Sequence, residues 1–210
     1  MDLEEYLAFI DTRAPDQHHH KETVNGFSLD VHPGVWNPAK GKSSKMMLKV
    51  LETYPLVDKA LDIGTGSGVL ALKLKYRGVP DVTATEYMDK AYENARLNFQ
   101  GTGIKLIKSD LFENIDGKYD LIVFNCPASH PKRTDISRSM YPLWSPDLDI
   151  RMKFIEALPE HLNENGTALL MYSRFPDFDP IPEDKINMKF NYLIRDTSSL
   201  SESGIIELRL

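Results

Sequence analysis

Residues 60–72 of the chain read ALDIGTGSGVLAL. The first four of them suit a buried strand, three glycines at alternate positions suit a tight turn, and the apolar residues that follow suit a helix. Glycine lets the backbone approach a ligand closely, and the first turn of a helix offers unpaired N–H groups. The stretch therefore predicts a strand, a glycine-rich turn and a helix that together bind a nucleotide-like ligand.

Two carboxylates near this turn indicate the class of ligand. The turn has the spacing G-x-G-x-G, whereas the dinucleotide fingerprint is G-x-G-x-x-G. Asp62 stands just before the first glycine, where it would repel a pyrophosphate but could accept a hydrogen bond from an amine, a hydroxyl or water. Glu86 ends a second predicted strand, roughly 20 residues downstream, where a carboxylate takes ribose hydroxyls in this class of fold. A ribose-bearing ligand without a pyrophosphate points to S-adenosylmethionine.

Three motifs then carry a resemblance to a known family: DIGTGSG at 62–68, TEYMDKAYENARLN at 85–98 and KSDLFENIDGKYDLIVFNCP at 108–127. The chain resembles the class I S-adenosylmethionine-dependent methyltransferases. Within them it is most similar to the branch that contains the release-factor glutamine methyltransferases and the small-domain RNA guanine methyltransferases. The resemblance runs over about residues 31–173.

The elements predicted after the glycine turn alternate between strand and helix. We expect helices at 89–99 and 148–162, and the remaining strands at 81–86, 104–109, 119–125, 167–172, 188–196 and 205–210. The last two strands have no helix between them and would form an antiparallel hairpin. The order predicts a doubly wound α/β fold, a mostly parallel seven-stranded sheet with helices on both faces.

We expect one domain over residues 1–210, in which an N-terminal helix and loop segment, residues 1–42, covers the active site. Within that segment the sequence predicts an amphipathic helix at 2–10, a polar loop at 12–22 and a strand at 27–31.

Two features further along the chain concern loops and caps. Ser43 or Ser44 is expected to cap a helix that runs to about residue 53. Residues 126–147 form a long, proline-rich segment without periodicity, which is typical of a functional or a disordered loop.

Composition narrows the partners and the compartment. The net charge is −6 and no basic block is present, so nucleic acid is a less favoured partner. No apolar run is long enough to span a membrane, the first residues are acidic, and there is a single cysteine, so we expect a cytoplasmic protein without a membrane partner. Three consecutive histidines, residues 18–20, lack the spacing of metal ligands, and no metal is expected.

Ligands of open α/β sheets bind outside the carboxyl ends of the strands, so residues there are the candidate cofactor-binding residues. Tyr87 and Met88 could pack on the adenine or fill core, and the resemblance implies that Asp110 accepts from the adenine amine with Leu111 beside the ring. An aspartate there would otherwise be a helix cap. The full predicted cofactor set is Asp62, Gly64, Thr65, Gly66, Gly68, Glu86, Tyr87, Met88, Asp110, Leu111 and Asn125.

The tetrapeptide at 125–128, NCPA, occupies the place of the family motif Asn/Asp-Pro-Pro-aromatic. The resemblance implies that the side chain of Asn125 and the backbone carbonyl after it accept hydrogen bonds from the target nitrogen, while Pro127 keeps the rigid turn. Cys126 and Ala128 replace the first proline and the aromatic. His130 is a candidate proton acceptor, and its alternative is an ordinary loop histidine. We therefore predict Asn125, Pro127 and His130 as the catalytic residues.

Loop residues are the candidate substrate contacts. Trp36, Tyr141 or Trp144 could supply the aromatic face that Ala128 lacks. Arg133 belongs to a basic group with two other cations of the long loop, and the group could hold an anionic part of the substrate or be solvated.

These residues predict an S-adenosylmethionine-dependent methyltransferase that moves a methyl group to a heteroatom, with nitrogen favoured because Asn125 is present. The lost aromatic, and the room of only about 25 residues before the first strand, favour a small-molecule substrate over a protein. The alternatives are a protein or RNA N-methyltransferase of the release-factor type and a cofactor-binding subunit without activity. A nicotinamide-dependent oxidoreductase is disfavoured by the glycine spacing and by Asp62.

Overall fold

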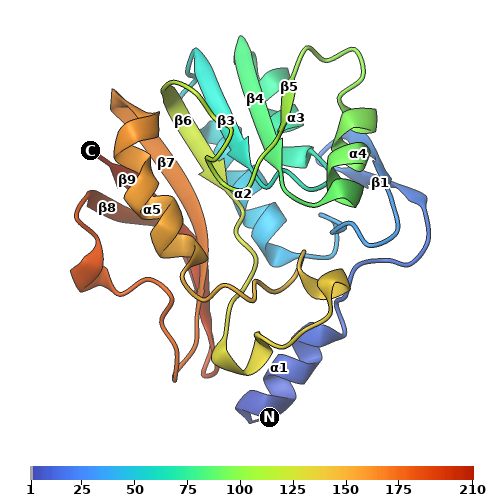
Figure 1. The fold of residues 1–210 in the computed structure, drawn as a ribbon, viewed down its shortest axis with the longest axis vertical. Coiled ribbons are helices and arrows are strands. Elements are labelled where there is room, and N and C mark those ends of the chain that lie inside the picture. The colour runs from blue at the N-terminus through green and yellow to red at the C-terminus, as the bar shows by residue number, and fades with distance from the viewer. Residues whose placement is uncertain (1) are drawn as a thin grey trace.

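A seven-stranded sheet forms the centre of the structure, a computed structural model that describes residues 2–210 (Figure 1). The strand order is β5-β4-β3-β6-β7-β9-β8, with β3 to β7 parallel and β9 antiparallel to both β7 and β8. Their bounds are β3 Lys59–Ile63, β4 Asp81–Glu86, β5 Lys105–Lys108, β6 Tyr119–Phe124, β7 Leu162–Arg174, β8 Lys189–Thr197 and β9 Glu202–Arg209. The predicted doubly wound fold and its C-terminal antiparallel hairpin are confirmed.

Helices cover both faces of this sheet because its strands are apolar on both sides. Leu121 and Val123 of β6 join the core under α2, α3 and α4, while Ile122 and Phe124 join the core under α5. In Figure 1, α5 crosses in front of the sheet and α2 and α3 lie behind it. The helices run over α2 Lys42–Thr53, α3 Val69–Tyr76, α4 Asp89–Asn98 and α5 Ile150–His161.

A β-hairpin precedes the sheet. Its strands, β1 His20–Val24 and β2 Phe27–Val31, pair antiparallel, so the predicted loop over 12–22 is wrong for its last residues. Because only one side of β1 is covered, most of its residues are polar, and the stretch therefore resembles a loop in sequence. Asn25 and Gly26 turn the hairpin with φ values of 52° and 85°, and this Asn-Gly pair was the signal that sequence reasoning missed.

The start of α2 also differs from its prediction. Gly41 is the N-cap and makes no side-chain hydrogen bond, so neither predicted serine caps the helix. Because the helix begins at Lys42, Ser44 lies within its first turn and is buried there.

The N-terminal helix and the long loop lie together at one end of the molecule. Helix α1, Leu3–Asp11, packs below the loop in Figure 1, and Leu7, Trp144 and Phe175 form a small separate core between them. The loop contains two short 3-10 helices, η1 Pro131–Arg133 and η2 Arg138–Met140, and a third, η3 Glu183–Lys185, precedes β8.

Gly68 tests how tightly the glycine-rich turn is built. It begins α3 with a φ of 92°, and a Cβ there would lie 2.5 Å from Cε1 of Phe99. Gly68→Ala should lower the free energy of unfolding by about 3 kcal/mol, because backbone strain and overpacking add. Gly101 is the matched control, with a φ of 74° and open space around its Cβ position, and Gly101→Ala should cost about 1 kcal/mol. Urea denaturation measures both values, and equal losses would contradict this account of the turn.

Candidate active site

A cavity of about 730 Å³ opens beside the carboxyl ends of β3, β4 and β6. Most of the residues predicted from sequence line it: Trp36, Asp62, Gly64, Thr65, Gly66, Glu86, Tyr87, Met88, Asp110, Leu111, Asn125, Pro127 and Tyr141. Its volume lies in the range of small-molecule sites. The position follows from topology, because β3 pairs with both β4 and β6 and the chain crosses to opposite sides of the sheet there.

Asp62 fastens the glycine-rich turn to the helix that follows. Its Oδ2 accepts hydrogen bonds from the Thr65 hydroxyl at 2.6 Å and from the Ala71 N–H at 3.1 Å. Its Oδ1 is buried and has no hydrogen-bond partner. Burial raises the pKa of Asp62 to about 7, against the lowering effect of these two bonds.

Glu86 joins the same turn to the end of β4. Its Oε2 accepts from the Gly66 N–H at 2.9 Å and its Oε1 from the Met88 N–H at 2.8 Å. Burial raises the pKa of Glu86, while these backbone hydrogen bonds oppose the rise. A carboxylate has about four acceptor positions, so these backbone donors leave acceptor capacity for a ligand.

The residues that follow β5 supply a different surface of the cavity. Asp110 is exposed on the cavity wall, and Leu111 beside it has a φ of 43°, an unusual value for a residue with a Cβ. The Ser109 hydroxyl donates to the Leu111 carbonyl at 3.1 Å and accepts from the Asn114 N–H at 3.0 Å. These bonds hold the strained backbone that presents Leu111 to the cavity.

Asn125 lies at the end of β6 with its side chain fixed from one side only. Its Nδ2 donates to the Ser44 hydroxyl at 3.2 Å, whereas its Oδ1 is buried and has no partner. Within residues 2–210, the only two buried side-chain oxygens without a partner are therefore those of Asp62 and Asn125, and both residues line the cavity. A buried oxygen without a partner costs about 1–3 kcal/mol, so each of the two favours a ligand group that donates a hydrogen bond to it.

Arg151 does not line the cavity but supports a turn that does, and sequence reasoning missed it. Its side chain is fully buried, donates to the Ser129 hydroxyl at 2.8 Å and also donates to the Pro127 carbonyl. It thereby holds the turn that follows Asn125. Its spacing could have revealed it. Arg151 lies at helical spacing from the apolar residues Phe154, Ile155 and Leu158, so the pattern places a cation on the buried face of α5.

His130, a predicted catalytic residue, does not line the cavity. Its ring is almost wholly buried, its Nδ1 accepts from the Lys132 N–H at 3.2 Å, and its Nε2 lies 3.0 Å from Asp177. The structure thus places both ring nitrogens in contacts that hold the loop.

Gly68, Trp144 and Arg133 also lie outside the lining. Gly68 starts α3. The Trp144 indole is fully buried and donates to Asp11 Oδ1 at 2.7 Å, and Arg133 Nε donates to Asp11 Oδ2 at 3.1 Å. One carboxylate of α1 therefore ties both loop residues, and both face α1 rather than the cavity.

Comparison with known proteins identifies the family. A family model of the methyltransferase small domain matches residues 27–194. The chain belongs to this family. The methyltransferase is thus an enzyme whose cofactor is S-adenosylmethionine, and the predicted resemblance, activity class and cofactor are confirmed.

Two relatives of the methyltransferase carry informative names. A protein of Methanocaldococcus jannaschii named as a protein N5-glutamine methyltransferase is 33% identical over 159 residues, 71% of this chain and 78% of that protein. A release factor glutamine methyltransferase of Mycolicibacterium smegmatis is 34% identical over 132 residues, 60% of this chain and 47% of that protein. The alignment thus spans less than half the length of the second relative.

The fold has counterparts among solved structures. The crystal structure of a ribosomal protein L11 methylase from Lactobacillus delbrueckii subsp. bulgaricus superposes with a TM-score of 0.56 at 23% identity, over 80% of this chain and 79% of that chain.

Across residues 2–210 no helix is long and apolar enough to cross a membrane, and no group of three histidine, cysteine or acidic side chains could hold a metal ion.

The pKa of Asp62 predicts a pH dependence of stability. The unfolded chain ionises this carboxyl near 3.8 and the folded chain near 7, so unfolding releases a proton between these values. The free energy of unfolding should therefore fall as pH rises from 4 to 7, by up to about 1.4 kcal/mol per pH unit from this group. Asp62→Asn removes the proton exchange and keeps an oxygen for Thr65 and Ala71.

Denaturation of both proteins across this pH range measures the effect. The stability of Asp62→Asn relative to the wild type should rise steadily with pH. A constant difference from pH 4 to pH 7 would show that Asp62 ionises near its ordinary pKa in the folded protein.

Proposed function

We propose that this protein transfers the methyl group of S-adenosylmethionine to the side-chain amide nitrogen of a glutamine in a protein. The observation that carries the proposal is the buried, unpartnered Oδ1 of Asn125 in the cavity. This oxygen can accept a hydrogen bond from an amide N–H of the acceptor. The names of the two relatives, both glutamine methyltransferases, support the same acceptor.

The residues of the cavity fit the cofactor. Asp62 Oδ1 is a free acceptor for an ammonium group, and the Glu86 carboxylate has acceptor capacity left for ribose hydroxyls. Asp110 can accept from the adenine amine, and the apolar side chains of Met88 and Leu111 can cover the ring. The cofactor supplies a methyl group activated by a positively charged sulfur.

Asn125 would act by positioning the acceptor. By accepting from one N–H of the amide, its Oδ1 turns the nitrogen lone pair toward the methyl group for in-line displacement. The new N–C bond forms as the S–C bond breaks, the electron pair of that bond stays on sulfur, and one N–H proton passes to water. Ser44 fixes the Asn125 amide from behind and Arg151 fixes the turn that follows it, so the geometry is set before the acceptor binds.

The small-molecule acceptor favoured from sequence finds no support in the names of the relatives, which give protein substrates. Its amide-bearing form remains compatible with the same use of Asn125. A free small amide is therefore the second acceptor to test.

A methylation assay tests the proposal. The enzyme is incubated with methyl-labelled S-adenosylmethionine and either a ribosomal protein fraction, a purified release factor or free glutamine. Acid hydrolysis releases labelled methylamine from a methylated side-chain amide. We expect label from one of the two protein preparations. Label from free glutamine alone would favour a small-molecule methyltransferase, and methylamine from none of the three would contradict an amide acceptor.

Variants locate the role of Asn125 in that assay. Asn125→Ala should lower kcat about 100-fold, because the loss of one preorganised hydrogen bond at a reacting group has an effect of that size. Ser44→Ala should lower it about tenfold, because the Asn125 amide loses its fixed orientation. Ser44→Ala should bind the cofactor as the wild type does. A wild-type kcat for Asn125→Ala would overturn this role.

A further inference from the structure

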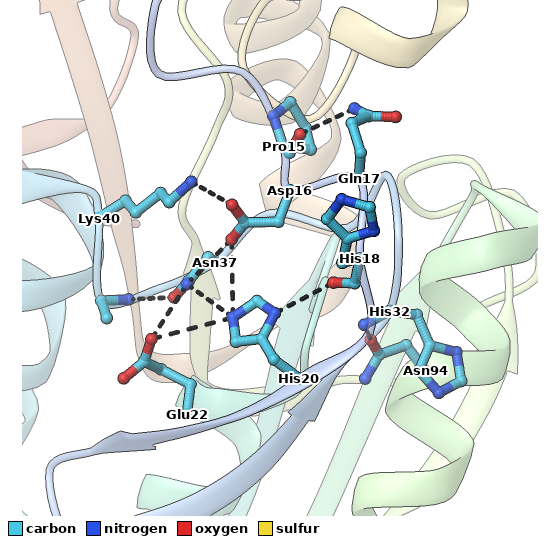
Figure 2. A network of polar contacts seen from close by, with 11 residues as sticks. Pro15, Asp16, Gln17, His18, His20, Glu22, His32, Asn37, Lys40 and Asn94 are labelled. Carbon is cyan, nitrogen blue, oxygen red and sulfur yellow. Dashed lines mark hydrogen bonds and ion pairs between the residues drawn. The ribbon is translucent and has the colours of Figure 1, made fainter.

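The loop at residues 35–41, here called the Trp36 loop, is held by a polar network that the proposed function leaves unexplained. Asn37 is only 3% exposed, and its Nδ2 lies 3.2 Å from acceptor atoms of Asp16, His20 and Glu22. Its Oδ1 accepts from the Ala39 N–H at 2.9 Å. Figure 2 shows these side chains converging on Asn37 from the N-terminal segment and β1. These contacts therefore fix Asn37, the residue that follows Trp36 in the loop.

The network holds an aromatic ring at the cavity. Trp36 is half-buried and lines the cavity, and its indole lies directly against Gly41. A Cβ at Gly41 would come within 2.7 Å of the ring atom Cζ2. Only a glycine leaves room for the indole in this position, which fixes where the ring can lie.

Trp36 and Asn125 belong to one connected unit. Gly41 is the N-cap of α2, and Ser44, in the first turn of that helix, accepts from the amide of Asn125. The start of α2 therefore contacts both the Trp36 indole, through Gly41, and the side-chain amide of Asn125, through Ser44. Ala128 lines the same cavity but has no ring to offer a substrate.

We propose that Trp36 forms the aromatic wall against which the planar acceptor amide stacks, and that it is thus a specificity-determining residue. The family motif Asn/Asp-Pro-Pro-aromatic has an aromatic residue at the position of Ala128, and Trp36 takes over the role of that residue. A planar amide presents two flat faces, and an indole covers one of them while Asn125 binds its edge. This inference rests on the proposed function.

Steady-state kinetics with the glutamine acceptor test the assignment. Trp36→Ala should raise KM for the acceptor about tenfold and leave the Kd of S-adenosylmethionine unchanged. Trp36→Phe should retain most of the affinity. The double variant Trp36→Ala/Ala128→Tyr should recover it in part, because it returns a ring to the motif position. Tyr76 is an exposed aromatic outside the cavity lining, and Tyr76→Ala should leave both constants unchanged.

A binding measurement gives a second readout that does not depend on turnover. Propionamide added in the presence of S-adenosylhomocysteine should change the tryptophan emission of the wild type, and this change should be absent in Trp36→Phe. An unchanged acceptor KM in Trp36→Ala, with a wild type that methylates glutamine, would overturn the role of Trp36 alone. A wild type that methylates no amide would overturn the proposed function and this inference with it.

Discussion

Two buried carboxylates hold the glycine-rich turn in the shape on which the rest of the site depends. Asp62 binds the Ala71 N–H at the start of α3, and Glu86 binds the N–H groups of Gly66 and Met88. Buried carboxylates are costly unless they are hydrogen-bonded, and the backbone donors of the turn offset that cost. The turn thus joins β3, α3 and β4 at the point where the chain crosses to opposite sides of the sheet, and the cavity opens there.

The same cavity contains the two buried side-chain oxygens that lack a partner within residues 2–210. One belongs to Asp62, on the side of the proposed cofactor, and the other to Asn125, on the side of the proposed acceptor. Leaving both unsatisfied lowers the stability of the free protein. Ligands that donate hydrogen bonds to these two oxygens would recover this loss of stability when they bind. A preformed site can in this way favour the binding of both molecules.

The sequence predicted the sheet and its helices, and most of the site residues that it predicted line the cavity, because strand ends and glycine spacing are local signals that topology brings together. It failed where a residue acts through tertiary contacts. Ser44 reads as a helix cap, yet it orients Asn125, and Arg151 reads as part of a helix, yet it holds the Pro127 carbonyl. Trp144 lies close to the site in sequence, but Asp11 of α1 draws its indole away from the cavity, and no local pattern predicts that contact.

Calorimetric titration tests whether the glycine-rich turn binds the cofactor. The titrants are S-adenosylmethionine and S-adenosylhomocysteine, and the proteins are the wild type and Glu86→Gln. Binding of the wild type with a micromolar Kd, about −8 kcal/mol, and binding of Glu86→Gln weakened about 10- to 100-fold are the predicted results. The unfolding midpoint of the variant checks that it folds. A wild type that binds neither compound, or a folded variant that binds both as tightly as the wild type, would contradict the account of this turn as the cofactor site.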